Sequence, residues 1–329
     1  MLQQTTVAAV RGRYDAFLAR FPDLPALARA RLSTVLAAWS GLGYYARARN
    51  LHAAARRIAA RHGGRVPRDP EALSALPGFG DYMAAAVASL AFGARVPAVD
   101  ANVARVVSRL FAVGAAGASA HAAIVRGHVA SLLPRRRPGD LTAALMDLGQ
   151  QICMPRRPRC DMCPAARFCA ALALGAPEDY PPRRSTPRPR RVHCAAAVAL
   201  SGGKTLVLRE KGALLRGLWL FPSAEAGTTA AARARLARAL LPLGLRFSPG
   251  APVAAARHTM VHRLLDIRVY RAEKVPSRRR GVRPLRGQTP ARWLTPERLA
   301  RAPIPTLTRK IAAAAGCLQP TSATISRAF

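Results

Sequence analysis

Four cysteines lie close together near the middle of the chain, with the spacing C-x6-C-x2-C-x5-C: Cys153, Cys160, Cys163 and Cys169. Thiolates are soft donors that hold iron–sulfur clusters or zinc in tetrahedral sulfur sites. Zinc ribbons usually combine two C-x2-C pairs, whereas this segment has one such pair with a longer arm on each side. The spacing therefore favours a 4Fe-4S cluster, with a structural zinc ion as the competing interpretation.

Disulfides are the other common use of closely spaced cysteines. They are typical of short secreted domains. This chain has 329 residues, it opens without a signal peptide, and the two remaining cysteines, Cys194 and Cys317, are isolated. We therefore expect free thiols, a metal-binding loop and a cytoplasmic protein.

The charge of the chain indicates the class of partner. Lys+Arg number 52 against 16 Asp+Glu, a formal net charge of +36, and such a field attracts phosphates. Most of the excess is arginine in an alanine-rich chain, so the charge supports a nucleic-acid partner without proving one. No apolar run approaches the roughly 18 residues that a membrane span needs, and the length favours about two domains. We expect a monomer that does not enter the membrane.

The hydrophobic pattern changes once along the chain. Residues 1–175 show helical periodicity, and the mixture of Pro and Arg in 176–191 predicts an extended linker. Beyond it, a hairpin is expected around Ser201–Lys204, a helix over 229–242, and a strand at LLDIRVY, residues 264–270. The sequence thus predicts a mainly α domain over 1–175 and an α+β domain over 192–329.

A helix–turn–helix unit is predicted between residues 69 and 92. Asp69 and Pro70 can cap and open a short helix, and Asp81 can start a second helix that runs to Phe92. Pro77, Gly78 and Gly80 form the turn between them, and glycines leave its backbone N–H groups open to a DNA phosphate. A P-G-x-G turn is also common as a plain corner between helices, so the pattern alone leaves both interpretations open.

Asp100 follows this unit and precedes the helical segment ANVARVVSRL. An Asp in this place is usually an N-cap. The helix dipole would also keep the carboxylate ionised beside the hairpin, where an anion can stabilise a cationic sugar. The two roles are compatible.

These pieces together resemble a known family. The opening MLQQT, WSGLGYYARARNL at 39–51, LPGFGDY at 76–82, VDANVARV at 99–106, LMDLG at 145–149 and the four-cysteine loop occur in the order found in MutY-type adenine DNA glycosylases, members of the helix-hairpin-helix Gly/Pro/Asp superfamily. The resemblance implies a helical glycosylase domain with a 4Fe-4S loop. It also implies base-excision repair: adenine opposite 8-oxoguanine or guanine is flipped out of double-stranded DNA and its glycosidic bond is hydrolysed.

The resemblance assigns roles to single residues. Asp100 would stabilise the oxocarbenium-like state, and Tyr82 stands where related endonuclease III enzymes carry a Schiff-base lysine. Because a phenol forms no imine, the resemblance implies a monofunctional glycosylase. The remaining residues expected to contact DNA or the adenine are Leu2, Gln3, Gln4, Tyr44, Pro77, Gly78, Gly80, Asn102, Asp147 and His262.

The second domain resembles the family's Nudix-like reader of the oxidised guanine. It has no run of closely spaced glutamates for metal binding, so we expect it to bind without cutting. The family's usual Phe-Ser-His recognition loop corresponds here to Met260, Val261 and His262. Val261 cannot form a side-chain hydrogen bond, which predicts weaker recognition of the lesion.

A glutamate that protonates adenine lies just upstream of MLQQT in the family, whereas this sequence begins at Met1. Two alternatives to an adenine glycosylase stay open. The first is an endonuclease III-like glycosylase and lyase, which Tyr82 and the second domain disfavour. A catalytically degenerate DNA-binding protein would follow if the general acid were absent.

Overall fold

The structure is a computed structural model that describes residue 1, residue 5 and residues 7–114, 117–182, 189–260, 262–275 and 290–318. Contacts divide the chain into two compact units, Met1–His52 with Pro187–Phe329, and Ala53–Thr186. The expected domain boundaries at residues 175 and 192 stay a prediction about which segments fold on their own.

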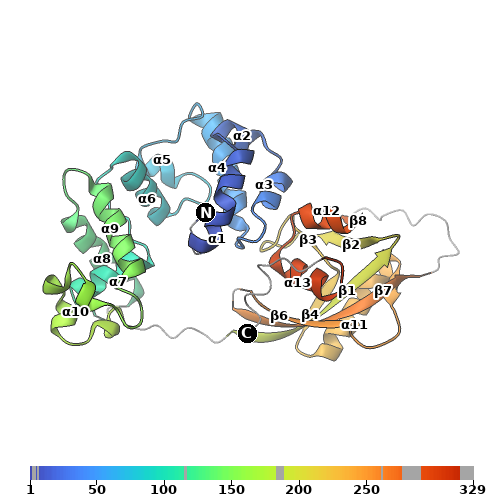
Figure 1. Ribbon diagram of the computed structural model, residues 1–329. Coiled ribbons are helices and arrows are strands. Elements are labelled where there is room, and N and C mark those ends of the chain that lie inside the picture. Colours follow the sequence, from blue (N-terminus) through green and yellow to red (C-terminus); the bar gives the residue numbers. More distant parts are fainter. Residues whose placement is uncertain are drawn as a thin grey trace. The chain divides into compact units, whose positions relative to one another are not determined.

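The unit Ala53–Thr186 is helical (Figure 1). Apolar residues of three of its helices form one core, which includes Val103, Val107, Val125 and Leu145. Its elements are the end of α4 (Ala46–Arg61), α5 (Pro70–Ser74), α6 (Asp81–Phe92), α7 (Ala101–Leu110), α8 (Ala118–Leu132), α9 (Pro138–Gln151), η1 (Cys160–Met162), η2 (Ala166–Phe168), α10 (Ala170–Ala173) and η3 (Pro177–Asp179).

The other unit begins with three helices, α1 (Val7–Arg20), α2 (Leu24–Arg29) and α3 (Leu32–Ala38). Phe17 packs against Phe21 and Trp39, with ring centroids 4.8 and 5.9 Å apart. This aromatic cluster fixes the end of α3, where a turn leads into α4.

A mixed β-sheet makes up most of the rest of this unit. The central strands β1 (Arg190–Ser201) and β7 (Arg263–Lys274) are parallel, and the other pairs are antiparallel. Along the main path the order is β3-β2-β1-β7-β5, and β4, β6 and β8 pair with β1, β7 and β2. The remaining strands are β2 (Lys204–Arg209), β3 (Trp219–Leu220), β4 (Ser223–Ala226), β5 (Leu245–Phe247), β6 (Ala254–Met260) and β8 (Ala291–Leu294). The expected hairpin is confirmed, since Ser201 pairs with Lys204.

Helices cover both faces of the sheet, as Figure 1 shows. Alternate residues of β1 point to opposite faces. Ala195 and Ala197 pack in the core that contains α11 (Thr229–Leu240), the helix expected over 229–242. Ala196 and Val198 pack in the core under α12 (Pro296–Arg301) and α13 (Thr306–Ala314). An α+β domain with a sheet between two helical layers results.

No helix within the described ranges combines the length and the apolar character that crossing a membrane requires.

Candidate active site and cluster loop

The predicted helix-hairpin-helix is present with the expected bounds. The Asp69 carboxylate accepts a hydrogen bond from the Ala72 N–H at 2.8 Å, and Pro70 opens α5. Gly78 has φ +81°, a left-handed conformation that favours glycine. Gly80 precedes α6, no side chain caps that helix, and a Cβ at Gly80 would meet nothing within 4 Å. The backbone N–H groups at the start of α6 are therefore accessible to an anion.

Asp100 is the N-cap of α7, as expected. Its Oδ1 accepts a hydrogen bond from the Val103 N–H at 2.7 Å, and its Oδ2 accepts one from Asn102 Nδ2 at 3.0 Å. Burial raises the pKa of Tyr82, and the charge of Asp100 raises it further. The structure thus brings Asp100, Tyr82 and Asn102 together, with the carboxylate oriented and the phenol protonated at neutral pH.

Arg105 connects this group to the start of the cysteine loop. Its guanidinium donates to Asn102 Oδ1 at 2.9 Å, to the Gly149 carbonyl at 2.7 Å and to the Cys153 carbonyl at 2.8 Å. All three of these acceptors are protein oxygens, so this arginine holds α7, α9 and the start of the loop together. Arg105 is not among the residues that the sequence patterns single out. The signal was an arginine inside an otherwise apolar helical pattern.

Helices α7 and α9 approach closely at Gly149. A Cβ added there would lie 2.7 Å from Asn102 Cβ and 3.1 Å from Asn102 Cα, closer than packed atoms tolerate. The glycine of LMDLG is thus required for the position of Asn102 beside Asp100. Asp147 is exposed on the same helix, and the described part of the chain shows no hydrogen bond between it and Asp100.

The four loop cysteines are free, half-buried and line one small cavity together with Arg109. Burial raises the pKa of the Cys160 thiol, and the other three cysteines raise it further. Over the described ranges, no group of three or more His, Cys, Asp or Glu side chains is placed to hold a metal ion. The cysteines share a cavity without converging on one point.

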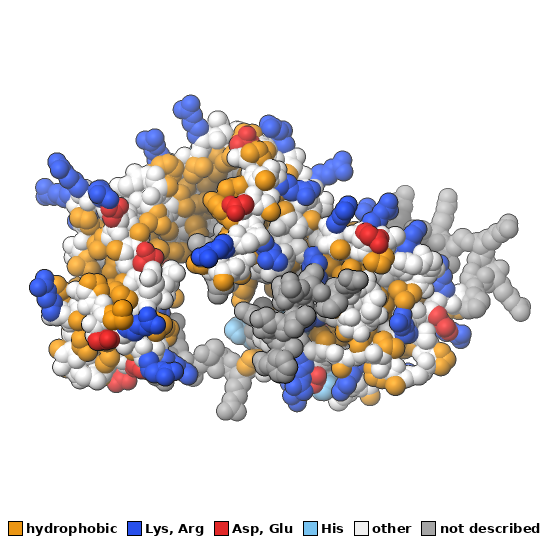
Figure 2. Space-filling view, in the orientation of Figure 1, with side chains coloured by type: hydrophobic (Ala, Val, Ile, Leu, Met, Phe, Trp, Pro, Cys, Tyr) orange, Lys and Arg blue, Asp and Glu red, His pale blue; other side chains and the backbone are white. Residues whose placement is uncertain are grey.

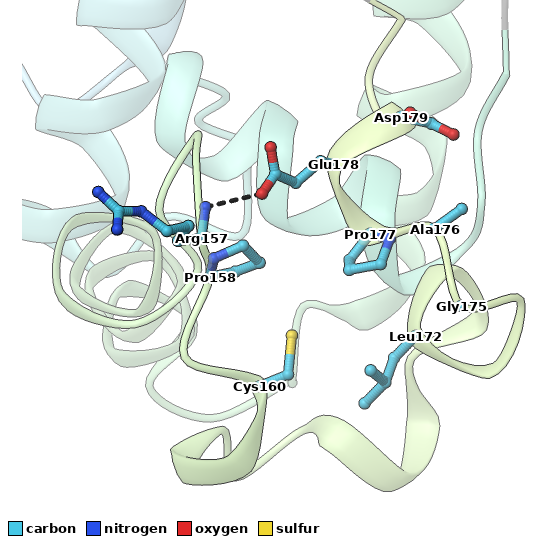
Figure 3. Close-up of a pocket in the computed structure, with 9 residues that line it drawn as sticks. All are labelled: Arg157, Pro158, Cys160, Leu172, Gly175, Ala176, Pro177, Glu178 and Asp179. Atoms are coloured by element: carbon cyan, nitrogen blue, oxygen red, sulfur yellow. Dashed lines mark hydrogen bonds between the residues drawn. The ribbon is translucent and has the colours of Figure 1, made fainter.

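A larger pocket of about 600 Å³ adjoins the loop. Figure 3 shows the Cys160 thiol pointing into it between Pro158, Pro177 and Leu172. The Glu178 carboxylate accepts a hydrogen bond from the Arg157 N–H at 2.9 Å, and Arg157 has φ +46°. Glu178 therefore stabilises the left-handed backbone conformation of Arg157, which residues other than glycine rarely adopt. The turn at Arg157 forms the wall of the pocket beside Cys160.

Arg109 of α7 is a buried cation that contacts the cysteine loop, with 2% of its surface exposed. It donates to Cys153 Sγ at 3.3 Å and to the carbonyls of Met154, Pro155 and Tyr180 at 2.7, 3.2 and 3.0 Å. Arg109 lies one helical turn after Arg105 on α7, and the sequence patterns do not single it out either. A buried positive charge therefore lies beside the Cys153 sulfur.

Tyr44 lies in the turn between α3 and α4, in the unit that contains the sheet. Tyr44 is 54% exposed, its φ is +43°, and the Arg47 guanidinium lies 5.6 Å from its ring centroid. The same guanidinium lies 5.3 Å from the Trp39 ring. Arg47 therefore lies near both rings and holds an exposed tyrosine beside a buried tryptophan.

The expected lesion loop is the turn between β6 and β7. Met260 pairs with Arg263 across this hairpin and packs against the sheet core, and His262 is exposed. The His262 carbonyl accepts a hydrogen bond from the Arg190 N–H at 2.8 Å. Val261, Leu2, Gln3 and Gln4 lie outside the described residues.

Helix α11 lies in the unit that contains the sheet. This helix, TAAARARLARAL, contains no Asp or Glu. The Glu225 carboxylate on β4 accepts a hydrogen bond from Arg263 at 2.5 Å. That the second domain binds without cutting stays a prediction.

Basic side chains are spread over the face in Figure 2, and acidic ones are sparse. Two family models match the chain. Residues 1–126 match the HhH-GPD superfamily base excision DNA repair proteins, and residues 195–314 match the NUDIX domain. The fold and the helix-hairpin-helix followed by Asp100 define a DNA glycosylase with an appended Nudix-like domain.

Curated relatives narrow the class. The adenine DNA glycosylase of Homo sapiens is 34% identical over 94% of this chain and 66% of its own length. That of Rattus norvegicus is 34% identical over 94% of this chain and 69% of its length. That of Mycobacterium tuberculosis is 44% identical over 56% of this chain and 61% of its length. The chain belongs to the adenine DNA glycosylase family and spans roughly two thirds of the length of these relatives.

Proposed function

We propose that this protein removes adenine mispaired with 8-oxoguanine or guanine in double-stranded DNA by hydrolysing its N-glycosidic bond. The position of the Asp100 carboxylate is the observation that carries the proposal. Its carboxylate is held by two hydrogen bonds at the N-terminus of α7, beside Tyr82. A fixed anion in that place suits the positive charge that develops on the deoxyribose as the bond breaks.

The helix-hairpin-helix supplies the phosphate contact. The backbone N–H groups after Gly80 bind a phosphate without reading the sequence. Adenine must leave the base stack before its bond can be reached, and the exposed ring of Tyr44 is suited to stack in the opened duplex. Leu2, Gln3, Gln4 and Asp147 are proposed to contact the displaced bases.

In this proposal the reaction ends with hydrolysis. The bond to adenine N9 breaks and adenine leaves after taking up a proton, while water adds to the anomeric carbon and releases a proton to solvent, so that the sugar gains a hydroxyl group. The resemblance assigns the proton donor to a glutamate that precedes the MLQQT segment. Tyr82 has no amine to form an imine with the opened sugar, so the DNA strand stays intact.

We propose that Cys153, Cys160, Cys163 and Cys169 hold a 4Fe-4S cluster. Such a cluster spreads its thiolates over several irons, whereas a single zinc ion draws four thiolates to about 2.3 Å from one point. Cysteines that share a cavity without converging fit the cluster, and Arg109 supplies a cation beside Cys153. When bound, the cluster crosslinks the loop. The purified protein is expected to contain about four irons per chain, and stoichiometric zinc without iron would contradict this.

The second domain is proposed to read the base opposite adenine, with His262 at the β6–β7 turn as a contact. We further propose that the protein acts as a monomer in the cytoplasm. Its six cysteines are free, which suits a reducing compartment.

Single-turnover adenine release from an 8-oxoguanine:adenine duplex tests the reaction. We expect release by the wild-type chain without strand cleavage, and no trapped adduct with borohydride. Asp100→Asn should slow release by at least about 100-fold, because it removes the charge. The amide oxygen can still cap α7, so the thermal midpoint serves as the folding control. A borohydride-trapped adduct would favour the lyase alternative, and DNA binding without release would favour the degenerate one.

A further inference from the structure

The turn that carries Tyr44 is bonded to a distant part of its own unit. Ser40 and Tyr45 flank this turn, and their hydroxyl groups both donate to the Ile304 carbonyl at 3.0 Å. Ile304 lies between α12 and α13 and is fully buried in the core under the sheet. One carbonyl of the Nudix-like fold thus fixes the turn from both sides.

Two arginines strengthen this connection. Arg309 on α13 donates to Ser40 Oγ at 3.0 Å and to the Ala300 carbonyl at 3.3 Å. Arg49 on α4 donates to the carbonyls of Ala213 and Arg216 at 3.0 and 3.3 Å. Tyr45 is 3% exposed, so its hydrogen bond is shielded from water. Shielded bonds to a rigid core limit the movement of the turn.

Tyr44 depends on these bonds for its position. Its side chain is exposed, its backbone is left-handed, and its ring lies beside the Arg47 guanidinium. Arg47 in turn donates to the Leu42 carbonyl at 3.1 Å, within the same turn. A turn that moved would carry Tyr44 with it.

We propose that Ser40 and Tyr45 are positioning residues, through which the Nudix-like core at Ile304 and Arg309 sets the place of the Tyr44 ring in DNA. This rests on the proposed function, because it assigns Tyr44 to the opened duplex. The domain that reads the base opposite adenine thereby also holds the side chain that stacks there. Selectivity for the lesion then depends on the hydrogen bonds of Ser40 and Tyr45 to the Ile304 carbonyl as well as on the lesion loop.

The hydrogen bonds also stabilise the fold, so the test needs a matched variant. Thr308 on α13 donates to the Trp219 carbonyl at 3.1 Å, a buried hydroxyl-to-carbonyl bond in the same core that does not touch the turn. Thr308→Val removes a bond of the same kind. The test variants are Tyr45→Phe and Ser40→Ala, and Ser40→Thr restores a hydroxyl. The Ile304 carbonyl keeps one donor in each single variant.

Three measurements are made on the full chain. Single-turnover adenine release compares 8-oxoguanine:adenine with guanine:adenine duplexes, 2-aminopurine beside the lesion reports stacking by fluorescence, and hydrogen exchange follows the amides of residues 39–49 without DNA. Tyr45→Phe and Ser40→Ala should each lower the selectivity by about fivefold, the effect of one lost hydrogen bond. Tyr45→Phe and Ser40→Ala should also weaken the 2-aminopurine stacking signal and speed the hydrogen exchange. Ser40→Thr should restore the selectivity, the fluorescence and the exchange rate to wild-type values. Thr308→Val should leave all three unchanged.

The proposal is overturned if Tyr45→Phe and Ser40→Ala keep the wild-type selectivity, fluorescence and exchange. It is also overturned if Thr308→Val lowers the selectivity as much as they do, because stability alone would then explain the loss. If the wild-type chain releases no adenine from either duplex, the proposed function fails. Exchange and 2-aminopurine fluorescence then decide the positioning role, since neither requires the reaction.

Discussion

At the scale of single residues, the arginines of this chain divide into two kinds. Arg105 and Arg109 donate hydrogen bonds to protein oxygens and to a cysteine sulfur inside the helical unit. Many others are exposed and available to phosphates. A guanidinium presents five donors in a planar fork, so one buried arginine can join several carbonyls that a lysine could not reach together. Net charge therefore overstates the number of cations that can meet DNA.

Arg109→Met should lower the free energy of unfolding by about 3 kcal/mol, because buried carbonyls lose a charged donor. Guanidinium unfolding followed by circular dichroism measures the change. Arg137→Met is the control. Arg137 pairs with Asp140 at the surface, its side chain is 83% exposed, and such a pair contributes little. Equal effects of the two variants would contradict a structural role for Arg109.

Val261 leads to a prediction about lesion preference. Valine has no group to donate to or accept from the oxidised guanine. The wild-type chain should therefore discriminate less between 8-oxoguanine and guanine opposite adenine than a chain with serine there, and Val261→Ser should raise the ratio of single-turnover rates by about fivefold. Val261→Thr, which keeps the β-branched shape, separates the hydroxyl from the change in size. Strong discrimination by the wild type, unchanged in both variants, would show that this turn does not read the base.

At the scale of elements, the contact between α7 and α9 decides the geometry around Asp100. The N-cap of α7 orients the carboxylate, and α9 holds Asn102 and Arg105 from the other side. Two helices can approach this closely only where one of them lacks a side chain. The hairpin and the Asp100 cap are local features, whereas their mutual position depends on this packing.

Gly149→Ala should therefore lower the free energy of unfolding by about 1 to 3 kcal/mol through overpacking against Asn102. Gly127→Ala in α8 is the matched control. A Cβ there meets nothing within 4 Å, so alanine should stabilise the helix by about 0.5 to 1 kcal/mol. Thermal unfolding of both variants checks the sign of each effect. A stabilised Gly149→Ala would mean that the helices are not packed as described.

At the scale of the whole molecule, charge governs affinity for DNA. With 52 Lys+Arg against 16 Asp+Glu, the chain carries an excess that releases counterions when it meets a phosphate backbone. Since some arginines are used internally, the number of phosphates neutralised must be measured and cannot be taken from the net charge.

We expect the logarithm of the DNA association constant to fall by about 0.9 per phosphate neutralised for each tenfold rise in salt. For about 6 to 10 contacts the slope would lie between roughly −5 and −9. Fluorescence anisotropy with a labelled duplex, from low to physiological salt, measures it. A duplex without a mismatch serves as the control, because phosphate contacts should give it a similar slope. A flat dependence would contradict binding through phosphates.

The parts of this protein that the sequence determined are local ones. Asp69 and Pro70, the Pro77–Gly80 turn, Asp100 and the hairpin at Ser201–Lys204 were all placed correctly as structural elements. Caps and tight turns depend on residues a few positions apart, whose chemistry is visible in order along the chain. The cysteine spacing likewise predicts a metal site in the loop, which stays a proposal.

Only the tertiary structure decided which residues meet across long separations. Tyr45 reaches the Ile304 carbonyl over 259 residues, and Arg109 reaches the Tyr180 carbonyl over 71. A guanidinium or a phenol has the same appearance in the sequence whether it faces water, DNA or a buried carbonyl. Its role follows from packing, because burial leaves a polar group stable only where a partner lies within hydrogen-bond distance.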